Sequence, residues 1–247
     1  MRVAVAGGTG LVGRYVVEEL ESAGQEAVVL ARSRGVDLLT GTGLDEAVEG
    51  VESVIDVSNL TTTSAKKSIA FFEPATHNLL RAGERAGVRH HVVLSVVGVD
   101  RVGLGYYKGK LRQEELVKDG PLPWTVLRAT QLHEFAQQTL GQVPGPVAVV
   151  PRMRTQPVAA KEVAQHLVRL ALAAPLGATT ELAGPQIEQL VDMARRLLRA
   201  QGRSRLVLPV PLPGATGAAM RGDGQLPTGP HARGEQTFEA WLSEHTV

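Results

Sequence analysis

The feature that most constrains the fold is a set of three spaced glycines near the amino terminus, Gly7, Gly10 and Gly13. The apolar residues 3–6 precede them and predict a buried strand, and apolar residues at helical spacing follow from Leu11. In such a strand–turn–helix unit the first glycine permits a tight turn, the second lets a pyrophosphate approach the backbone, and the third lets the helix pack close to the strand. The free N–H groups at the start of the helix also attract phosphate. The amino terminus therefore predicts a dinucleotide-binding turn.

Between this turn and residue 130, short apolar strands alternate with helices. Such alternation predicts βαβ units, a parallel sheet and right-handed crossovers. Pro74 lies inside one predicted helix, where we expect it to cause a kink or a break. The expected strands are 27–30, 54–57, 91–95 and 124–127, and the expected helices are 44–48, 64–86 and 106–118. The fold class is therefore α/β, a Rossmann-type doubly wound parallel sheet.

The alternation becomes irregular after residue 130. Glycine and proline are frequent there, and residues 209–231 are expected to form loops. The other elements expected in this part are helices over 161–174, 186–200 and 237–244 and a strand over 180–182. We therefore expect a dinucleotide-binding domain over residues 1–130 and a smaller C-terminal substrate lobe over 131–247, interlaced with the first domain as one unit.

Composition excludes several classes of function. The chain has no cysteine, which excludes disulfides, thiolate nucleophiles and zinc–thiolate sites, and His90 and His91 are adjacent rather than spaced as a metal pair. The formal net charge of +1 argues against a general polyanion binder. The first apolar run is too short for a signal peptide, and no stretch is long enough to span a membrane. We expect a cytoplasmic protein that takes a small-molecule substrate and binds no nucleic acid, membrane or metal, with its oligomeric state left open.

The end of the second predicted strand distinguishes between the two nicotinamide dinucleotides. NAD enzymes usually carry an acidic residue there, which holds the ribose hydroxyls. This chain has Arg32 followed by Ser33, and a guanidinium pairs well with the 2′-phosphate of NADP(H). The alternative is a solvated arginine in an arginine-rich chain. The sequence therefore favours NADP(H) over NAD(H).

Tyr106 and Lys110 are the candidate catalytic pair. They lie four residues apart in the helix predicted over 106–118, so they share one face. A nearby ammonium favours tyrosinate and would lower the pKa of the phenol, which suits a tyrosine that exchanges a proton with a carbonyl oxygen. The alternative is an amphipathic helix with a solvated lysine.

Together these motifs resemble the short-chain dehydrogenase/reductase superfamily, in its extended and atypical branches that include the NmrA-like NAD(P)-binding proteins. The resemblance covers most of the chain and rests on residues 7–13, 94–100, 124–131 and 181–185. It implies that Tyr106 is the acid/base, and that Lys110 bonds the nicotinamide ribose. The remaining cofactor contacts that it implies are Gly7, Thr9, Gly10, Leu11, Val12 and Gly13 at the phosphates, Arg32 and Ser33 at the 2′-phosphate, Asp37 at the adenine, and Ser58 and Asn59 along the cofactor trough.

One departure from the family pattern concerns the catalytic serine, which commonly follows another serine at the end of the strand predicted here over 91–95. Val96 stands in that place, and strand alternation points Ser95 the other way. Gln131 and His133 are candidate substrate-binding helpers by position. The implied function is an NADP(H)-dependent oxidoreductase acting on a small carbonyl, quinone or similar hydride acceptor. Two alternatives stay open: a non-catalytic NADP(H)-binding redox sensor or regulator of the NmrA type, which Val96 favours, and an epimerase of the nucleotide-sugar type.

Overall fold

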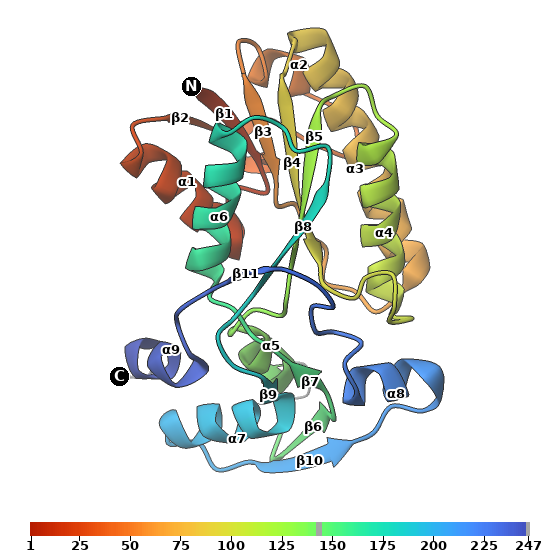
Figure 1. The fold of residues 1–247 in the computed structure, drawn as a ribbon, viewed down its shortest axis with the longest axis vertical. Coiled ribbons are helices and arrows are strands. Elements are labelled where there is room, and N and C mark those ends of the chain that lie inside the picture. The colour runs from red at the N-terminus through yellow and green to blue at the C-terminus, as the bar shows by residue number, and fades with distance from the viewer. Residues whose placement is uncertain (142–144, 246–247) are drawn as a thin grey trace. The chain divides into compact units, whose positions relative to one another are not determined.

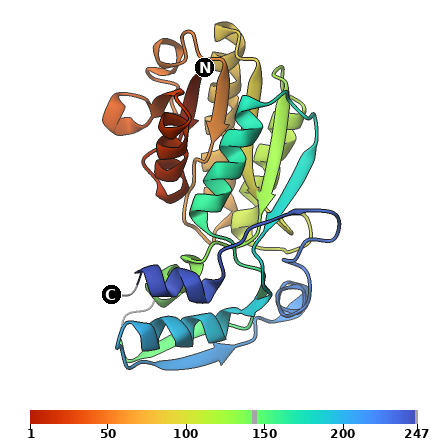
Figure 2. The ribbon, with the colours of Figure 1, turned by 60° about the vertical axis from the view of Figure 1, so that its left-hand side comes forward.

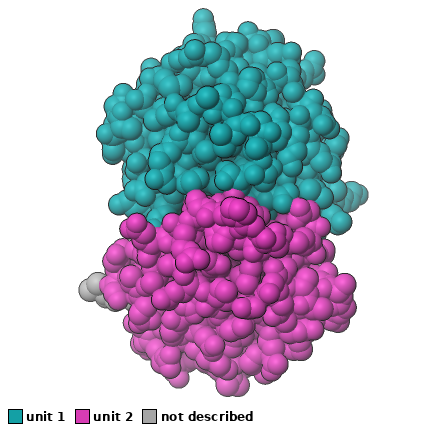
Figure 3. Space-filling model, viewed as in Figure 1, with its two compact units in different colours: residues 1–96, 104–128, 161–180 teal, residues 97–103, 129–160, 181–247 magenta. Residues whose placement is uncertain are grey.

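The computed structural model describes residues 1–141 and 145–245 (Figure 1) and contains two compact units, which Figure 3 shows in different colours. Unit 1 comprises Met1–Val96, Leu104–Arg128 and Lys161–Thr180, and unit 2 comprises Val97–Gly103, Ala129–Ala160 and Glu181–Val247. The chain passes from unit 1 to unit 2 after Arg128, close to the expected boundary at residue 130. The segment Lys161–Thr180, which was expected in the second lobe, belongs to unit 1. Within the described ranges, each helix is too short or too polar to cross a membrane.

The described part of the chain forms a seven-stranded sheet in the order β11-β8-β5-β4-β3-β1-β2. β1 pairs in parallel with β2 on one side and with β3 on the other, which places Val5 between Val29 and Ile55. The predicted α/β fold with a parallel sheet of Rossmann type is confirmed. The strands are β1 (Arg2–Ala6), β2 (Glu26–Leu30), β3 (Ser53–Asp56), β4 (His90–Val96), β5 (Trp124–Ala129), β8 (Thr179–Ala183) and β11 (Ala232–Arg233).

Helices cover both faces of the sheet, and its central strands are apolar for that reason. Val3, Val5, Val54 and Ile55 are fully buried. Figures 1 and 2 show α1 and α6 on one face and α3 and α4 on the other, with α2 beside α3. These helices are α1 (Leu11–Ser22), α2 (Leu44–Ala47), α3 (Ala65–Ala86), α4 (Gly105–Lys118) and α6 (Ala160–Leu172).

α3 continues through Pro74 as a single helix of 22 residues, so the break that proline could have caused does not occur. Proline removes one helical N–H group, and the carbonyl that loses its donor is four residues earlier, at Ala70. Ala70 is exposed, so water can replace the missing donor. The hydroxyl of Ser64 accepts a hydrogen bond from the Lys67 amide at 3.3 Å and caps the start of this helix.

Unit 2 contains a second pair of parallel strands. β6 (Val147–Pro151) pairs in parallel with β10 (Leu206–Val210), and α7 (Leu190–Ala200) packs against both. α7 begins at Leu190 rather than at the expected residue 186, because Glu188 and Gln189 form β9, which pairs with β7 (Arg154–Thr155). The remaining described helices are α5 (Phe135–Gly141), α8 (Gly214–Arg221) and α9 (Phe238–His245).

The expectation that residues 209–231 form only loops is wrong. The segment contains the end of β10 and the eight-residue helix α8. Gly217 lies inside α8, where a Cβ atom would be 1.7 Å from the carbonyl oxygen of Leu212. Gly217 therefore lets α8 pack closely against the Leu212 carbonyl, whereas the frequent glycines of this segment had suggested a loop.

His91 in β4 is completely buried, and neither ring nitrogen has a hydrogen-bond partner among the described residues. Burial lowers the pKa of His91 to about 4, against the opposing effect of the Asp56 carboxylate. As the pH falls below 6.5, His91 becomes protonated in the unfolded chain but stays neutral in the folded chain until the pH reaches its lowered pKa. The contribution of His91 to the free energy of unfolding should therefore be constant above pH 6.5 and fall by up to about 3 kcal/mol as the pH decreases to 4.

Urea unfolding of the wild type and of His91→Leu at about pH 7 and about pH 4.5 tests this expectation. Leucine has a similar volume and no titratable group, so the variant should lose less stability on acidification than the wild type. Carboxylates that titrate in the same range affect both proteins alike and cancel in the comparison. Equal losses in the two proteins would show that His91 is not the group responsible.

Candidate functional site

The turn after β1 is shaped by two glycines that have no room for a side chain. Gly7 has a left-handed φ of 81°, and a Cβ atom there would lie 2.8 Å from the Cα atom of Ser58. A Cβ atom at Gly13 would lie 2.1 Å from the carbonyl oxygen of Gly7, so this glycine lets α1 approach the end of β1. Packing within unit 1 therefore requires glycine at both positions.

Packing does not require Gly10 in the same way. This residue is exposed, has extended backbone with φ −77°, and a Cβ atom would meet only the Gly7 carbonyl oxygen, at 3.2 Å. It is also the N-cap of α1 and supplies no side-chain hydrogen bond to the first turn of that helix. The start of α1, with the exposed Thr9 beside it, therefore offers backbone N–H groups and the positive end of the helix dipole to an anion.

This turn lies where the strand order reverses, because the chain passes from β1 to β2 on one side and then to β3 on the other. In doubly wound sheets, ligands bind at such a reversal, outside the carboxyl ends of the strands. Ser58 follows β3 at this edge, and its buried hydroxyl has no hydrogen-bond partner among the described residues. A buried hydroxyl of this kind fits a ligand that supplies a partner, as the hydroxyl and phosphate groups of a dinucleotide do.

Arg32, Ser33 and Asp37 lie in the segment after β2. Arg32 and Ser33 are exposed in a short 3-10 turn, and the Arg32 guanidinium has no hydrogen bond or ion pair with the described residues. The Asp37 carboxylate accepts a hydrogen bond from the Leu39 amide at 2.8 Å and so stabilises its own turn. Arg32 and Ser33 are therefore available to a ligand, whereas Asp37 already has a structural partner.

Tyr106 lies in the first turn of α4, and its phenol donates a hydrogen bond to Oδ1 of Asn59 at 2.8 Å. The contact joins α4 to the residue that follows Ser58 at the edge of the sheet. Burial, and to a lesser extent Tyr107, raises the pKa of the Tyr106 phenol. The lowered pKa expected from Lys110 is therefore wrong. The phenol is protonated at neutral pH, which makes it a proton donor.

Lys110 is almost completely buried, and its ammonium points into unit 1. The Nζ atom donates to the Leu94 carbonyl oxygen at 2.5 Å and to Oε1 of Gln113, and it lies 4.7 Å from the centre of the Phe72 ring. Burial lowers the pKa of Lys110 to about 8, and Asp56 and Glu114 oppose that effect. In this arrangement the ammonium already has three partners, which explains why it does not act on the Tyr106 phenol.

Gln113 and Asp56 extend this network to the edge of the sheet. Nε2 of Gln113 donates to one oxygen of Asp56 at 2.8 Å, and the backbone amide of Ser58 donates to the other at 2.9 Å. The network thus links Lys110 in α4 to the turn after β3. Sequence reasoning missed both residues. The available signal was the carboxylate of Asp56 inside an apolar strand, because a carboxylate is almost never fully buried unless it is paired.

Two glycines in α4 allow this helix to pack closely against the start of α3. A Cβ atom at Gly105 would lie 2.1 Å from the Thr63 carbonyl oxygen, and one at Gly109 would lie 2.2 Å from the Ser68 hydroxyl oxygen. That hydroxyl donates to the Tyr106 carbonyl oxygen at 2.8 Å. Residues on either side of the Tyr106 side chain are therefore fixed by packing, which restricts where the phenol can lie.

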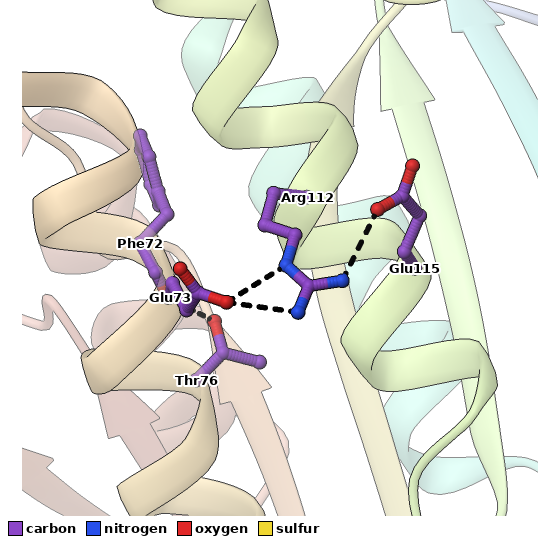
Figure 4. A network of polar contacts seen from close by, with 5 residues as sticks. All are labelled: Phe72, Glu73, Thr76, Arg112 and Glu115. Carbon is purple, nitrogen blue, oxygen red and sulfur yellow. Dashed lines mark hydrogen bonds and ion pairs between the residues drawn. The ribbon is translucent and has the colours of Figure 1, made fainter. Parts of the chain in front are cut away.

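An ion pair joins the same two helices farther along (Figure 4). The Arg112 guanidinium donates to one oxygen of Glu73 through Nε at 2.9 Å and through a terminal nitrogen at 2.8 Å, and it lies 3.4 Å from Glu115. Thr76, in the next turn of α3, donates its hydroxyl to the Phe72 carbonyl at 2.6 Å. The ion pair thus holds α4 against α3 beyond the two glycine contacts.

Val96, the position that departs from the family pattern, is the half-buried last residue of β4. Ser95 is buried and points to the opposite face, as strand alternation requires. An aliphatic side chain therefore occupies the place where the family pattern has a hydroxyl that polarises a carbonyl.

Gln131 and His133 belong to unit 2. The His133 ring is completely buried beside Phe238 and Trp241, at centroid distances of 5.7 and 5.9 Å, and its Nε2 atom lies 3.0 Å from the Gln236 carbonyl oxygen. This is the environment of a core histidine. We therefore assign His133 to the core of unit 2, while the role of Gln131 as a substrate-binding helper stays a prediction.

Comparison with known proteins gives evidence of the chain's family that is independent of the site geometry. The sequence profile of the NAD(P)H-binding family matches residues 31–174, which is more than half of the chain. This range begins directly after β2, so the glycine turn lies outside it.

The chain also matches two characterised relatives over about half of its length. It is 31% identical over 157 residues to (4-alkanoyl-5-oxo-2,5-dihydrofuran-3-yl)methyl phosphate reductase of Streptomyces griseus, a match that covers 58% of the chain and 51% of the relative. It is 24% identical over 142 residues to quinone oxidoreductase 2 of Escherichia coli, which covers 51% of the chain and 47% of the relative. The chain thus spans about half the length of these relatives.

Solved structures share the fold over nearly the whole chain. The NADPH-dependent quinone oxidoreductase of Escherichia coli, in complex with NADPH, has a TM-score of 0.72 at 19% identity, over 99% of this chain and 100% of that chain. A short-chain dehydrogenase/reductase superfamily protein of Agrobacterium tumefaciens with bound NAD has a TM-score of 0.71 at 19% identity, over 100% of this chain and 96% of that chain.

Proposed function

Because the chain belongs to the NAD(P)H-binding family and has the fold of the short-chain dehydrogenase/reductase superfamily, we propose that it is an NADP(H)-dependent oxidoreductase. Its acceptor is a small carbonyl, quinone or similar compound. The observation that carries the proposal is the contact between Tyr106 and Asn59, which joins a proton donor to the edge where the glycine turn lies. The reductase and quinone oxidoreductase among the relatives support the same class of reaction.

The proposed cofactor site uses the groups that the fold leaves available. The backbone amides from Thr9 to Val12 would hold the pyrophosphate, because Gly10 leaves their approach open. The unpartnered hydroxyl of Ser58 would bond a ribose or phosphate oxygen. Arg32, with Ser33 beside it, would pair with the 2′-phosphate through its planar fork. A nicotinamide bound in this site supplies the hydride for a reduction.

Tyr106 is the proposed general acid. The phenol is protonated at neutral pH, so it can donate a proton to an oxygen of the substrate that becomes negative during reduction. The phenol has one hydrogen, which it donates to Asn59, so it must release this hydrogen bond to protonate the substrate. The contact with Asn59 therefore positions the phenol oxygen at the edge of the sheet, where a substrate oxygen would replace Asn59 as the acceptor.

Lys110 has a positioning role in this proposal. Its ammonium anchors α4 to the Leu94 carbonyl and, through Gln113, to Asp56, which in turn orients the turn at Ser58. Two of the three N–H groups of the ammonium bond the Leu94 carbonyl and Gln113, so the third is the one that would bond a nicotinamide ribose, as the family resemblance implies.

A redox sensor that binds NADP(H) without catalysis is the second candidate function. Two observations favour it: Val96 supplies no hydroxyl at the end of β4, and the Lys110 ammonium is occupied inside unit 1. Oxidation of NADPH, followed by its absorbance with panels of carbonyls and quinones, separates the two functions. An oxidoreductase turns over at least one compound, and a sensor turns over none.

Arg32 should determine the choice of cofactor. A charge-assisted contact contributes about 1.5–3 kcal/mol, so NADPH should bind roughly ten- to hundredfold more tightly than NADH. Arg32→Ala should remove most of this difference in calorimetric titrations. Arg34→Ala removes an exposed guanidinium from the same short turn and should leave the difference intact. Equal affinities of the wild type for NADPH and NADH would contradict the NADP(H) preference.

A further inference from the structure

Unit 2 carries a surface cavity of about 420 Å³ that the proposed reaction does not use. Three arginines line it, Arg152, Arg195 and Arg221, together with one carboxylate, that of Asp192. These groups give the cavity an excess of two positive charges. The three arginines are exposed, so their excess charge attracts anions most strongly at low ionic strength.

The backbone around the cavity is also suited to an anion. Arg152 directly follows β6, and Pro209 near the end of the parallel neighbour β10 lines the same cavity. Gln189, the N-cap of the eleven-residue helix α7, lines it too and makes no side-chain hydrogen bond to the first turn of that helix. The carboxyl ends of two parallel strands and the start of a helix therefore meet at the cavity, as they do at phosphate sites of α/β proteins.

The three arginines differ in how they are already bonded. Arg195 lies 3.2 Å from the Asp192 carboxylate, one turn earlier in α7. Arg221 in α8 donates one terminal nitrogen to the Leu212 carbonyl oxygen at 2.9 Å, which holds its guanidinium in place and leaves its other donors for a ligand. Arg152 has no side-chain hydrogen bond or ion pair with any residue in the described part of the chain. Arg152 and Arg221 are thus the two lining arginines that have no carboxylate partner among the described residues.

We propose that this cavity binds a phosphate group, either as free phosphate or as part of a small phosphate ester. A phosphate dianion matches the excess of two positive charges, and its oxygens match the paired donors of a guanidinium. Val191 and Pro209 provide the apolar part of the lining, against which the carbon skeleton of an ester can lie. The site is separate from the proposed dinucleotide turn, since all of its residues belong to unit 2.

Calorimetric titration of the wild-type chain with inorganic phosphate and with glycerol 3-phosphate tests the proposal. We expect saturable binding that Arg152→Gln and Arg221→Gln each weaken by roughly tenfold or more, because each removes a charge-assisted contact. Asp192→Asn should strengthen binding, since it removes the one carboxylate that lines the cavity. Tighter binding of glycerol 3-phosphate than of phosphate would identify an ester as the ligand, and equal binding would identify free phosphate.

Two control variants test whether the phosphate binds in this cavity. Arg203→Gln removes the same charge from an exposed residue beyond the end of α7 and should have no effect. Gly10→Val blocks the turn in unit 1 and should also leave this phosphate binding unchanged. Loss of binding in Gly10→Val alone, an equal loss in Arg203→Gln, or no binding of either probe by the wild type would overturn the proposal.

Discussion

Tyr106→Phe is expected to lower turnover on a genuine substrate by about 10²- to 10⁴-fold, the usual contribution of a positioned general acid. The phenylalanine ring can keep the contact with Phe72, and only the hydroxyl and its hydrogen bond to Asn59 are lost. NADPH affinity and the circular dichroism spectrum should therefore stay close to those of the wild type. The measurement is the rate of NADPH oxidation at saturating substrate.

Tyr107→Phe is the matched control, because it removes the same atom from the adjacent residue. Tyr107 is only 3% exposed, so its phenol cannot reach a substrate, and turnover should be nearly unchanged. Full turnover in Tyr106→Phe would show that the catalytic assignment is wrong. Val96→Ser adds a second test, since a rise in rate would show that a polarising hydroxyl is missing from a working site.

Gly13→Val should disrupt folding of unit 1, whereas Gly10→Val should abolish NADPH binding in a folded protein. A Cβ atom at Gly13 meets backbone atoms at 2.1 and 2.7 Å, which cannot move aside as a side chain can. Overpacking of this kind typically costs about 1–3 kcal/mol and more where backbone is involved. At Gly10 the branched side chain extends into the open space at the start of α1, and the loss of a good N-cap residue costs only about 1 kcal/mol.

Thermal unfolding by circular dichroism and titration by NADPH fluorescence distinguish the two glycine variants. Gly13→Val should have a much lower Tm or fail to fold, and Gly10→Val should unfold near the wild-type temperature without binding NADPH. If folded Gly10→Val binds NADPH as tightly as the wild type, the turn is not the cofactor site.

The sequence was sufficient to predict unit 1 because its elements follow strong local patterns. The strand at 3–6, the glycine turn and the helix from Leu11 each have a separate physical signature, and all three occur as β1, its turn and α1. Unit 2 was harder to predict. α8 has glycine, alanine and threonine in place of an apolar face, so its sequence resembles a loop, and its position depends on close contact between Gly217 and Leu212.

The contacts of Tyr106 and Lys110 could not be predicted from their spacing in the sequence. Tyr106 and Lys110 share a helix face as predicted, yet the tyrosine contacts Asn59 and the lysine contacts the Leu94 carbonyl and Gln113. The long lysine side chain can reach partners on a neighbouring strand, and spacing within α4 gives no information about them. Asp56, which completes this network, lies 54 residues before Lys110 in the sequence and meets it only through the parallel sheet and its covering helix.

An NMR titration of the ¹⁵N-labelled chain with NADPH shows which backbone amides respond to the ligand. We expect the largest shift changes at Thr9 to Gly13 and at Ser58, with smaller changes at Arg32 and Ser33. Absence of any change at saturating NADPH, or changes confined to residues of unit 2, would contradict the claim that the glycine turn of unit 1 binds the dinucleotide.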